Sequence, residues 1–174
     1  MQKGRSGGMR SDGAVTTGSM KPLHWKLVVD AADPHAQAAF WAAALHYREE
    51  DHSALVRRLL GMGAVPDGAT AAVHEGTEDE RLGWRDLAAV RHPDEPYDED
   101  TDAGLGHRIL FQRVPEAKSV KNRIHLDLHT EEGARDKEVA RLTDLGATVL
   151  REVDEPSGSW VVMADPEQNE FCVQ

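Results

Sequence analysis

The sequence is short of cysteine, of basic residues and of long apolar runs. Cys172 is the only cysteine, so the chain forms no internal disulfide, and a reducing, cytoplasmic location is expected. The formal net charge of −11 leaves no basic excess for nucleic acid or for an anionic membrane surface. No apolar run approaches the roughly 18 residues of a membrane span, and the start lacks the residue order of a signal peptide. We therefore expect neither nucleic acid nor membrane as a partner.

The length of 174 residues predicts one folded domain preceded by a tail. Residues 1–20 are rich in Gly, Ser and Thr and hold almost no large apolar side chain. Such a segment buries too little apolar surface to offset the entropy lost when it is ordered. We predict a flexible tail over residues 1–20 and a single domain over residues 21–174.

The segment 122–130 alternates between apolar and ionisable side chains. Ile124, Leu126 and Leu128 fall on one face, and His125, Asp127 and His129 fall on the other, which is typical of a half-buried strand. The polar face of such a strand meets either water or a wet cavity. A helix is predicted next, with Thr130 as its cap, with Val139, Leu142 and Leu145 on its apolar face and with Gly146 at its end.

The same order of strand and helix is found earlier in the chain. Residues 24–30 alternate in the same way, and Asp33 followed by Pro34 predicts the start of a helix. When Ile124 is laid over Trp25, His125 falls on Lys26. This correspondence favours two copies of one supersecondary unit.

The other elements are predicted more coarsely. Asp51 is expected to cap a second helix that ends near Gly61 and Gly63. Residues 92–102 hold six acids and two prolines and are predicted as a solvated loop. Further strands are predicted over residues 70–74, 82–91, 107–114, 159–163 and 170–174, the last two as a hairpin.

Four segments together resemble one known family. They are Trp160–Met163 with the turn Asp165–Phe171, Asp30–Pro34 with Phe40 and Trp41, Ile109–Glu116, and Arg123–Asp127. They are similar to the glyoxalase/bleomycin-resistance group, the vicinal oxygen chelate superfamily, and to its glyoxalase-like branch in actinobacteria. The resemblance covers roughly residues 22–174. It implies an α+β fold of two βαβββ modules, about 21–116 and about 122–174, that form a curled mixed sheet around a cavity. It also implies a homodimer.

The resemblance further implies a divalent metal in the cavity, such as Zn, Ni, Mn or Fe. His125 matches the family's histidine ligand, but the other ligand positions carry Lys26, Gln112 and Cys172. A charged lysine repels a cation, so this set is poor. A shifted set of His24, His125 and Glu170 is the better expectation, and a protein without metal is the other.

The candidate site residues each have a structural alternative. His125 is the expected catalytic base and Asp127 its orienting carboxylate, although Asp127 could instead pair with Arg123 or Arg113. Glu170 could pair across strands, and Cys172 could be a buried thiol that acts as a small hydrophobic residue. The expected cavity lining is Trp84, Gln112, Trp160 and Cys172, although core packing explains both tryptophans equally well.

Two classes of function follow from this interpretation. The first is a lyase, isomerase or dioxygenase in which the metal polarises substrate oxygens. The second is a protein of bleomycin-resistance type that sequesters a small molecule without chemistry, and the acidic surface would suit a cationic ligand there. A structural or regulatory subunit is a third hypothesis.

Overall fold

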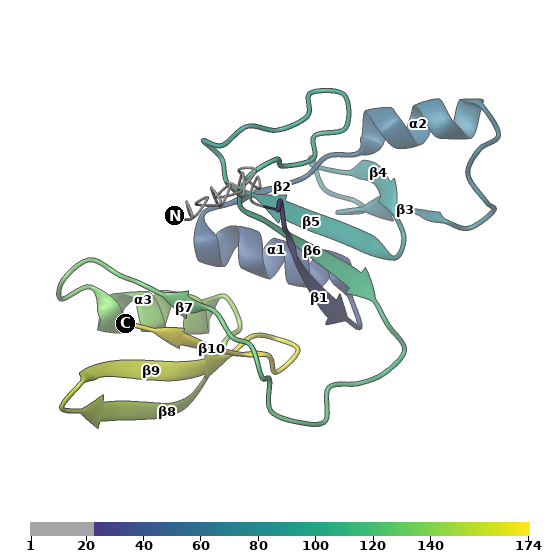
Figure 1. Cartoon of the computed structure of the whole chain (residues 1–174). Helices are drawn as coiled ribbons and strands as arrows, with labels where there is room; N and C mark the ends of the chain where they lie inside the picture. The colour runs from purple at the N-terminus through teal and green to yellow at the C-terminus, as the bar shows by residue number, and fades with distance from the viewer. Residues whose placement is uncertain (1–22) are drawn as a thin grey trace, which may run out of the picture.

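The computed structural model describes residues 23–174 and shows two modules, each with a small curled sheet (Figure 1). The expected tail, residues 1–20, lies outside the described residues. In the part of the chain that is described, no helix has the length and apolar character needed to cross a membrane.

The first module contains one four-stranded sheet and an inserted helix and hairpin. Its sheet has the order β1-β6-β5-β2, in which β1 and β6 run parallel and the other pairs run antiparallel. The insertion lies between β2 and β5. The elements are β1 (Leu27–Ala31), α1 (Pro34–Leu45), β2 (Arg48–Glu49), α2 (Ser53–Gly61), β3 (Thr70–Val73), β4 (Arg81–Trp84), β5 (Leu87–Arg91) and β6 (Arg108–Arg113).

The second module repeats this arrangement without the insertion. Its sheet has the order β7-β10-β9-β8, again with a parallel first pair and two antiparallel pairs. Both modules are therefore βαβββ units, and the predicted α+β fold with curled mixed sheets is confirmed. The elements are β7 (Asp127–Leu128), α3 (Arg135–Asp144), β8 (Thr148–Glu155), β9 (Gly158–Ala164) and β10 (Glu170–Val173).

The first helix begins where the sequence predicts. Asp33 is the N-cap of α1, and its carboxylate accepts hydrogen bonds from the backbone N–H groups of His35 and Ala36 at 3.1 and 3.2 Å. Pro34 occupies the first helical position, where its missing N–H has no partner to lose. The N-cap of α2 is His52 and not the predicted Asp51, although Asp51 accepts a hydrogen bond from the N–H of Ser53, the first residue of α2, at 2.9 Å.

Thr130 is not the cap of α3, so that prediction was wrong. The helix begins at Arg135 after Ala134, and neither makes a side-chain capping bond. Both the hydroxyl and the N–H of Thr130 donate to the carbonyl of Gln174 instead, at 2.7 and 2.8 Å. Thr130 therefore bonds to the last residue of the chain instead of capping the helix that follows it.

Two other local predictions require correction. The predicted strand over residues 82–91 is divided into β4 and β5, because Arg85 and Asp86 bond outside the strand, to Ala69 and Arg113. The acidic loop is not simply solvated. Its Asp102 accepts two hydrogen bonds from Arg91, at 2.7 and 3.2 Å, and one from the N–H of Asp51 at 2.7 Å.

A single hydrophobic core joins the two modules. Trp41 of α1 packs edge to face against Phe171 of β10, with 5.3 Å between ring centroids. Glu167, in the last turn, accepts hydrogen bonds from the N–H groups of Ala32 and Asp33 at 2.8 and 2.7 Å. The last turn of the second module therefore binds the start of α1.

Candidate functional site

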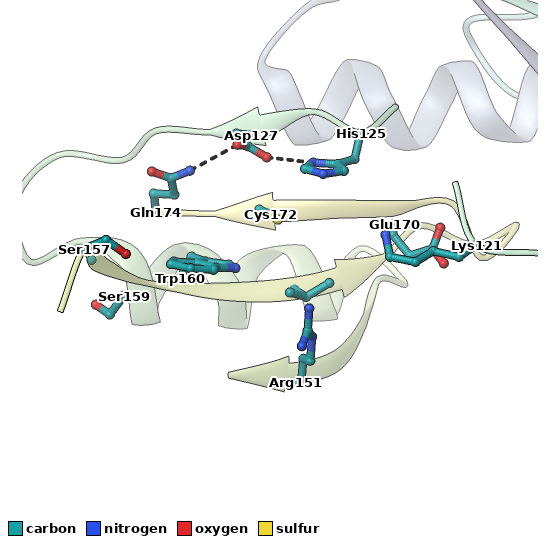
Figure 2. Close-up of a pocket in the computed structure, with 12 residues that line it drawn as sticks. Lys121, His125, Asp127, Arg151, Ser157, Ser159, Trp160, Glu170, Cys172 and Gln174 are labelled. Carbon is teal, nitrogen blue, oxygen red and sulfur yellow. Dashed lines mark hydrogen bonds and ion pairs between the residues drawn. The ribbon is translucent and has the colours of Figure 1, made fainter. Parts of the chain in front are cut away.

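A cavity of about 380 Å³ lies on one face of the second sheet (Figure 2). The core-facing side chains of this sheet, among them Leu128 and Val173, pack into the shared hydrophobic core. Because side chains alternate along a strand, their neighbours line the cavity. The lining residues are Lys121, His125, Asp127, Arg151, Ser157, Gly158, Ser159, Trp160, Val162, Glu170, Cys172 and Gln174.

Asp127 is the centre of the hydrogen bonding in this cavity. Nδ1 of His125 lies 2.9 Å from Oδ1 of Asp127, and Nε2 of Gln174 donates to Oδ2 at 3.3 Å (Figure 2). An ionised carboxylate only accepts hydrogen bonds, so Nδ1 of His125 carries the proton. In the neutral imidazole, Nε2 is then free to accept a proton or to bind a metal. The expected orienting role of Asp127 is thus geometrically available.

Cys172 lies opposite Asp127 on the neighbouring strand and is almost fully buried, with 8% of its surface exposed. Burial raises the pKa of the Cys172 thiol, and the charge of Asp127 and the hydrogen bond to it raise that pKa further. The positive charges of Lys121 and Arg151 act in the other direction. The thiol therefore stays protonated at neutral pH until a cation displaces the proton.

Three possible metal ligands meet at this point. The ligand atoms of His125, Asp127 and Cys172 all lie within 4.8 Å of one another. They offer one nitrogen, one oxygen and one sulfur, and three protein ligands are the usual number in a catalytic zinc site. The residues present therefore fit a divalent metal, with positions left for substrate or water.

The expected set of His24, His125 and Glu170 is not brought together. His24 lines a separate cavity between the modules, and its Nε2 lies 2.8 Å from the carbonyl oxygen of Leu105. Glu170 lines the same cavity as His125 but pairs with Lys118 at 3.1 Å and accepts a hydrogen bond from the N–H of Asn122 at 2.9 Å. Burial opposes ionisation of Glu170, but these two contacts outweigh it and lower its pKa.

The remaining predicted cavity residues are divided between the modules. Trp160 lines the cavity of the second sheet together with Cys172. Trp84 lies in β4 of the first module, where its carbonyl oxygen is 2.8 Å from Nε2 of His35. Gln112 is an exposed residue of β6 that pairs with Asp30 and does not line this cavity.

The strand register explains why Gln112 and Cys172 are not equivalent. Cys172 is paired with Asp127, and Leu110 is paired with Val28, which stands where Asp127 stands in the repeat. Leu110 is therefore the first-module counterpart of Cys172. The first module offers two apolar side chains where the second offers a thiol and a carboxylate.

Sequence reasoning did not find Gln174, Arg151 or Lys121 as cavity residues. The alternation of β10 could have indicated Gln174, because it lies two residues after Cys172 on the same face. No local pattern indicates Arg151, since a bulge between Val149 and Arg151 shifts the pairing of β8 with β9.

Comparison with known proteins identifies the family of the chain. The family model of the glyoxalase-like domain matches residues 26–174. Comparison with curated proteins finds no match.

The chain is also similar to several solved structures. One is a fosfomycin resistance protein, FosX, from Mesorhizobium loti, with 10% identity, coverage of 89% of this chain and 92% of that chain, and a TM-score of 0.53. A second is a FosX variant from Listeria monocytogenes, complexed with Mn(II) and 1S,2S-dihydroxypropylphosphonic acid, with 10% identity, coverage of 89% and 90%, and a TM-score of 0.52. A bleomycin-binding protein from Streptomyces verticillus has 16% identity, coverage of 89% and 97%, and a TM-score of 0.47.

At these identities the structures share the fold alone. The narrower actinobacterial branch of the family stays a prediction. The family model spans both βαβββ modules, and the chain belongs to the glyoxalase-like domain family.

Proposed function

We propose that the chain is a metal-dependent glyoxalase-like enzyme that binds a small molecule in the cavity of the second sheet. The observation that supports this most strongly is the group of ligand atoms on His125, Asp127 and Cys172, all within 4.8 Å of one another at the cavity wall. A divalent ion held there would polarise oxygen atoms of the substrate, as lyases and isomerases of this type require.

The ligand chemistry narrows the choice of metal. A thiolate and an imidazole suit Zn, Fe(II) or Ni, whereas Mn(II) prefers oxygen ligands. The Listeria fosfomycin resistance protein with Mn(II) supports a metal in this fold but does not define the metal of this chain. We therefore place Zn, Ni and Fe(II) before Mn for this set of ligands.

The other cavity residues would orient the site and the substrate. Gln174 donates to Asp127 and so orients the carboxylate that would hold the metal. In the chain without metal, Asp127 also fixes the orientation of the His125 ring. The indole of Trp160 offers a flat apolar surface against which a substrate can pack. Without metal, Nε2 of His125 remains available as a general base, and Asp127 holds the required tautomer.

A non-catalytic ligand-binding protein is the second candidate. The side chains of His125 and Asp127 are 41% and 40% exposed, so the site is open to water as it stands. An open cavity suits binding without chemistry at least as well as it suits a reaction from which water must be excluded. The two functions differ in whether a bound metal is required.

Metal content and thermal stability test the proposal. The full chain, purified without chelator, is analysed for metal and melted with and without added Zn, Ni, Mn or Fe(II). A stoichiometric metal, or a rise in Tm that His125→Ala abolishes, is the expected result. His129→Ala is the matched control, because His129 lies four residues after His125 and outside the cavity. Absence of metal and of any Tm change would overturn the metal-dependent enzyme and leave a metal-free catalyst or a ligand-binding protein.

A homodimer is part of the same proposal. Large apolar side chains in the segments before β1 and before β7 are exposed: Trp25 to 75%, Val120 to 75% and Ile124 to 76%. A second copy that covers these side chains would remove apolar surface from water. Light scattering on the full chain tests this, and Trp25→Lys is expected to favour the monomer.

A further inference from the structure

The carboxylates of the cavity already have partners within the protein. Asp127 accepts hydrogen bonds from His125 and Gln174, and Glu170 is paired with Lys118. Both carboxylates therefore have partners before any ligand binds.

The basic groups of the same cavity are not neutralised. Among residues 23–174, neither Arg151 nor Lys121 forms an ion pair with a carboxylate, although both line the cavity. Arg91, Arg108, Arg113 and Arg141, in contrast, each have such a partner. Because Lys118 offsets Glu170, the charges of Lys121 and Arg151 face only one remaining carboxylate, Asp127. The local balance of charge is therefore positive, whereas the whole chain carries −11.

The position of Arg151 depends on a specific feature of the backbone. The bulge in β8 comes immediately before Arg151 and pairs it with Val162, which also lines the cavity. Figure 2 shows the Arg151 side chain directed from β8 toward the strands that carry Val162 and Cys172. A bulge of this kind redirects a side chain that regular alternation would place on the other face.

We propose that this cavity selects an anionic small molecule, with its carboxylate, phosphate or phosphonate group bound by Arg151 and attracted by Lys121. A guanidinium binds the oxygens of such a group in a bidentate manner, and a lysine adds a second positive charge. The ligand places its apolar part against Trp160. This inference rests on the proposed cavity site and reverses the expectation of a cationic ligand, which considered only the net charge.

Three probes of similar size and different charge test the selection. Phenylphosphonate, benzamide and benzamidine are titrated separately into the full chain without metal, so that a bound metal cannot be the partner of the anion. Binding is followed by NMR at the indole N–H of Trp160, which is assigned with Trp160→Phe. Phenylphosphonate is expected to shift this signal at lower concentration than either other probe.

Variants of Arg151 identify the group that binds the anion. Arg151→Gln is expected to weaken phenylphosphonate binding by roughly tenfold or more, and Arg151→Lys by less. Arg57→Gln removes the same charge from an exposed position of α2 and is expected to change nothing. Arg151 is itself exposed, so its replacement leaves the core intact.

The outcomes distinguish this inference from the proposed function. Equal binding of all three probes, no binding of any of them, or no effect of Arg151→Gln overturns the anion selection. The metal proposal does not depend on these results, because metal content and the effect of His125→Ala on Tm are measured without any probe. Conversely, tight phenylphosphonate binding by a protein that takes up no metal would support the anion site and reject the metal.

Discussion

The indole nitrogen of Trp41 donates a hydrogen bond to the carboxylate of Asp165, with 3.2 Å between Nε1 and Oδ2. Trp41 belongs to α1 of the first module, and Asp165 lies in the turn that joins β9 and β10 of the second. Asp165 is fully buried and also accepts hydrogen bonds from the N–H groups of Glu167 and Asn169. Together with the packing of Trp41 on Phe171, this contact makes the two modules interdependent.

Replacement of Trp41 by Phe is expected to destabilise the whole chain. The change removes one hydrogen bond to a buried carboxylate as well as packing against Phe171, and the expected cost is about 1–3 kcal/mol in the free energy of unfolding. Urea unfolding measures it. Trp25→Phe, at a site 75% exposed, is the control and should cost less than about 0.5 kcal/mol. Two separate transitions in either protein would show that the modules unfold independently.

The buried Glu50 should be essential to the first module. Its carboxylate accepts hydrogen bonds from Arg108 at 2.6 and 2.7 Å and from the N–H of Gly104 at 2.8 Å. Glu50→Gln leaves Arg108 without its charge partner, and the expected loss is about 3–5 kcal/mol, since the pair is buried. Glu132→Gln, at an exposed site, is the control for the change in net charge.

The pKa of Glu50 also predicts an acid limit of stability. Burial would raise this pKa, but hydrogen bonds from His52, Arg108 and Gly104 outweigh it and lower the pKa to about 2. Because the folded-state pKa is depressed, the stabilisation is present above the unfolded pKa of about 4.5 and is lost as the pH falls toward 2. The free energy of unfolding of Glu50→Gln should change less over this range than that of the unmodified chain. Parallel pH profiles would contradict the assignment.

His52 predicts a loss of stability at the other end of the pH range. Burial would lower the pKa of His52, but its hydrogen bonds to Glu50 and to the carbonyl of Thr101 raise it above the ordinary 6.5. The protonated ring donates to both, whereas the neutral ring donates only once. Its stabilisation is therefore complete below pH 6.5 and is lost as the pH rises through the raised pKa.

Unfolding measured from pH 6 to 9 tests this prediction. The unmodified chain should lose more stability over that range than His52→Gln, which has no proton to lose. Chymotrypsin cleavage within residues 92–106, where Tyr97 and Leu105 are exposed, should become faster in parallel, since Thr101 belongs to that loop. The control is His129→Ala, because His129 is exposed and lies far along the chain from this loop. Equal pH dependence in all three proteins would exclude the role of His52.

Local chemistry was sufficient to predict those parts of the fold whose partners lie nearby in the sequence. Asp33 and Pro34 start α1 because both act within one helical turn. The alternation of residues 124–128 separated Leu126 and Leu128, which pack on the core, from His125 and Asp127, which line the cavity. It failed for Ile124, which is 76% exposed, and the strand itself is only Asp127–Leu128. A pattern of this kind needs no knowledge of the partner strand.

The parts that failed depend on distant partners. Thr130 has every property of a helix cap, yet it binds Gln174 at the end of the chain. Alternation predicted His24 on the same strand face as Lys26, but His24 precedes β1 and contacts Leu105 rather than His125. The bulge that brings Arg151 into the cavity is a property of the β8 and β9 pairing. Strand register and long-range hydrogen bonds decide these cases, and a single sequence does not encode them locally.

Cobalt(II) binding tests the proposed metal site of His125, Asp127 and Cys172 most directly. A cobalt ion bound to a cysteine thiolate gives an intense near-ultraviolet absorption band, which oxygen and nitrogen ligands do not give. Titration of the full chain with cobalt(II) should give this band at one ion per chain. Cys172→Ser should remove the band, His125→Ala should weaken binding strongly, and His129→Ala should change neither. If the unmodified chain shows no such band, or if the band survives in Cys172→Ser, the metal site of His125, Asp127 and Cys172 is wrong.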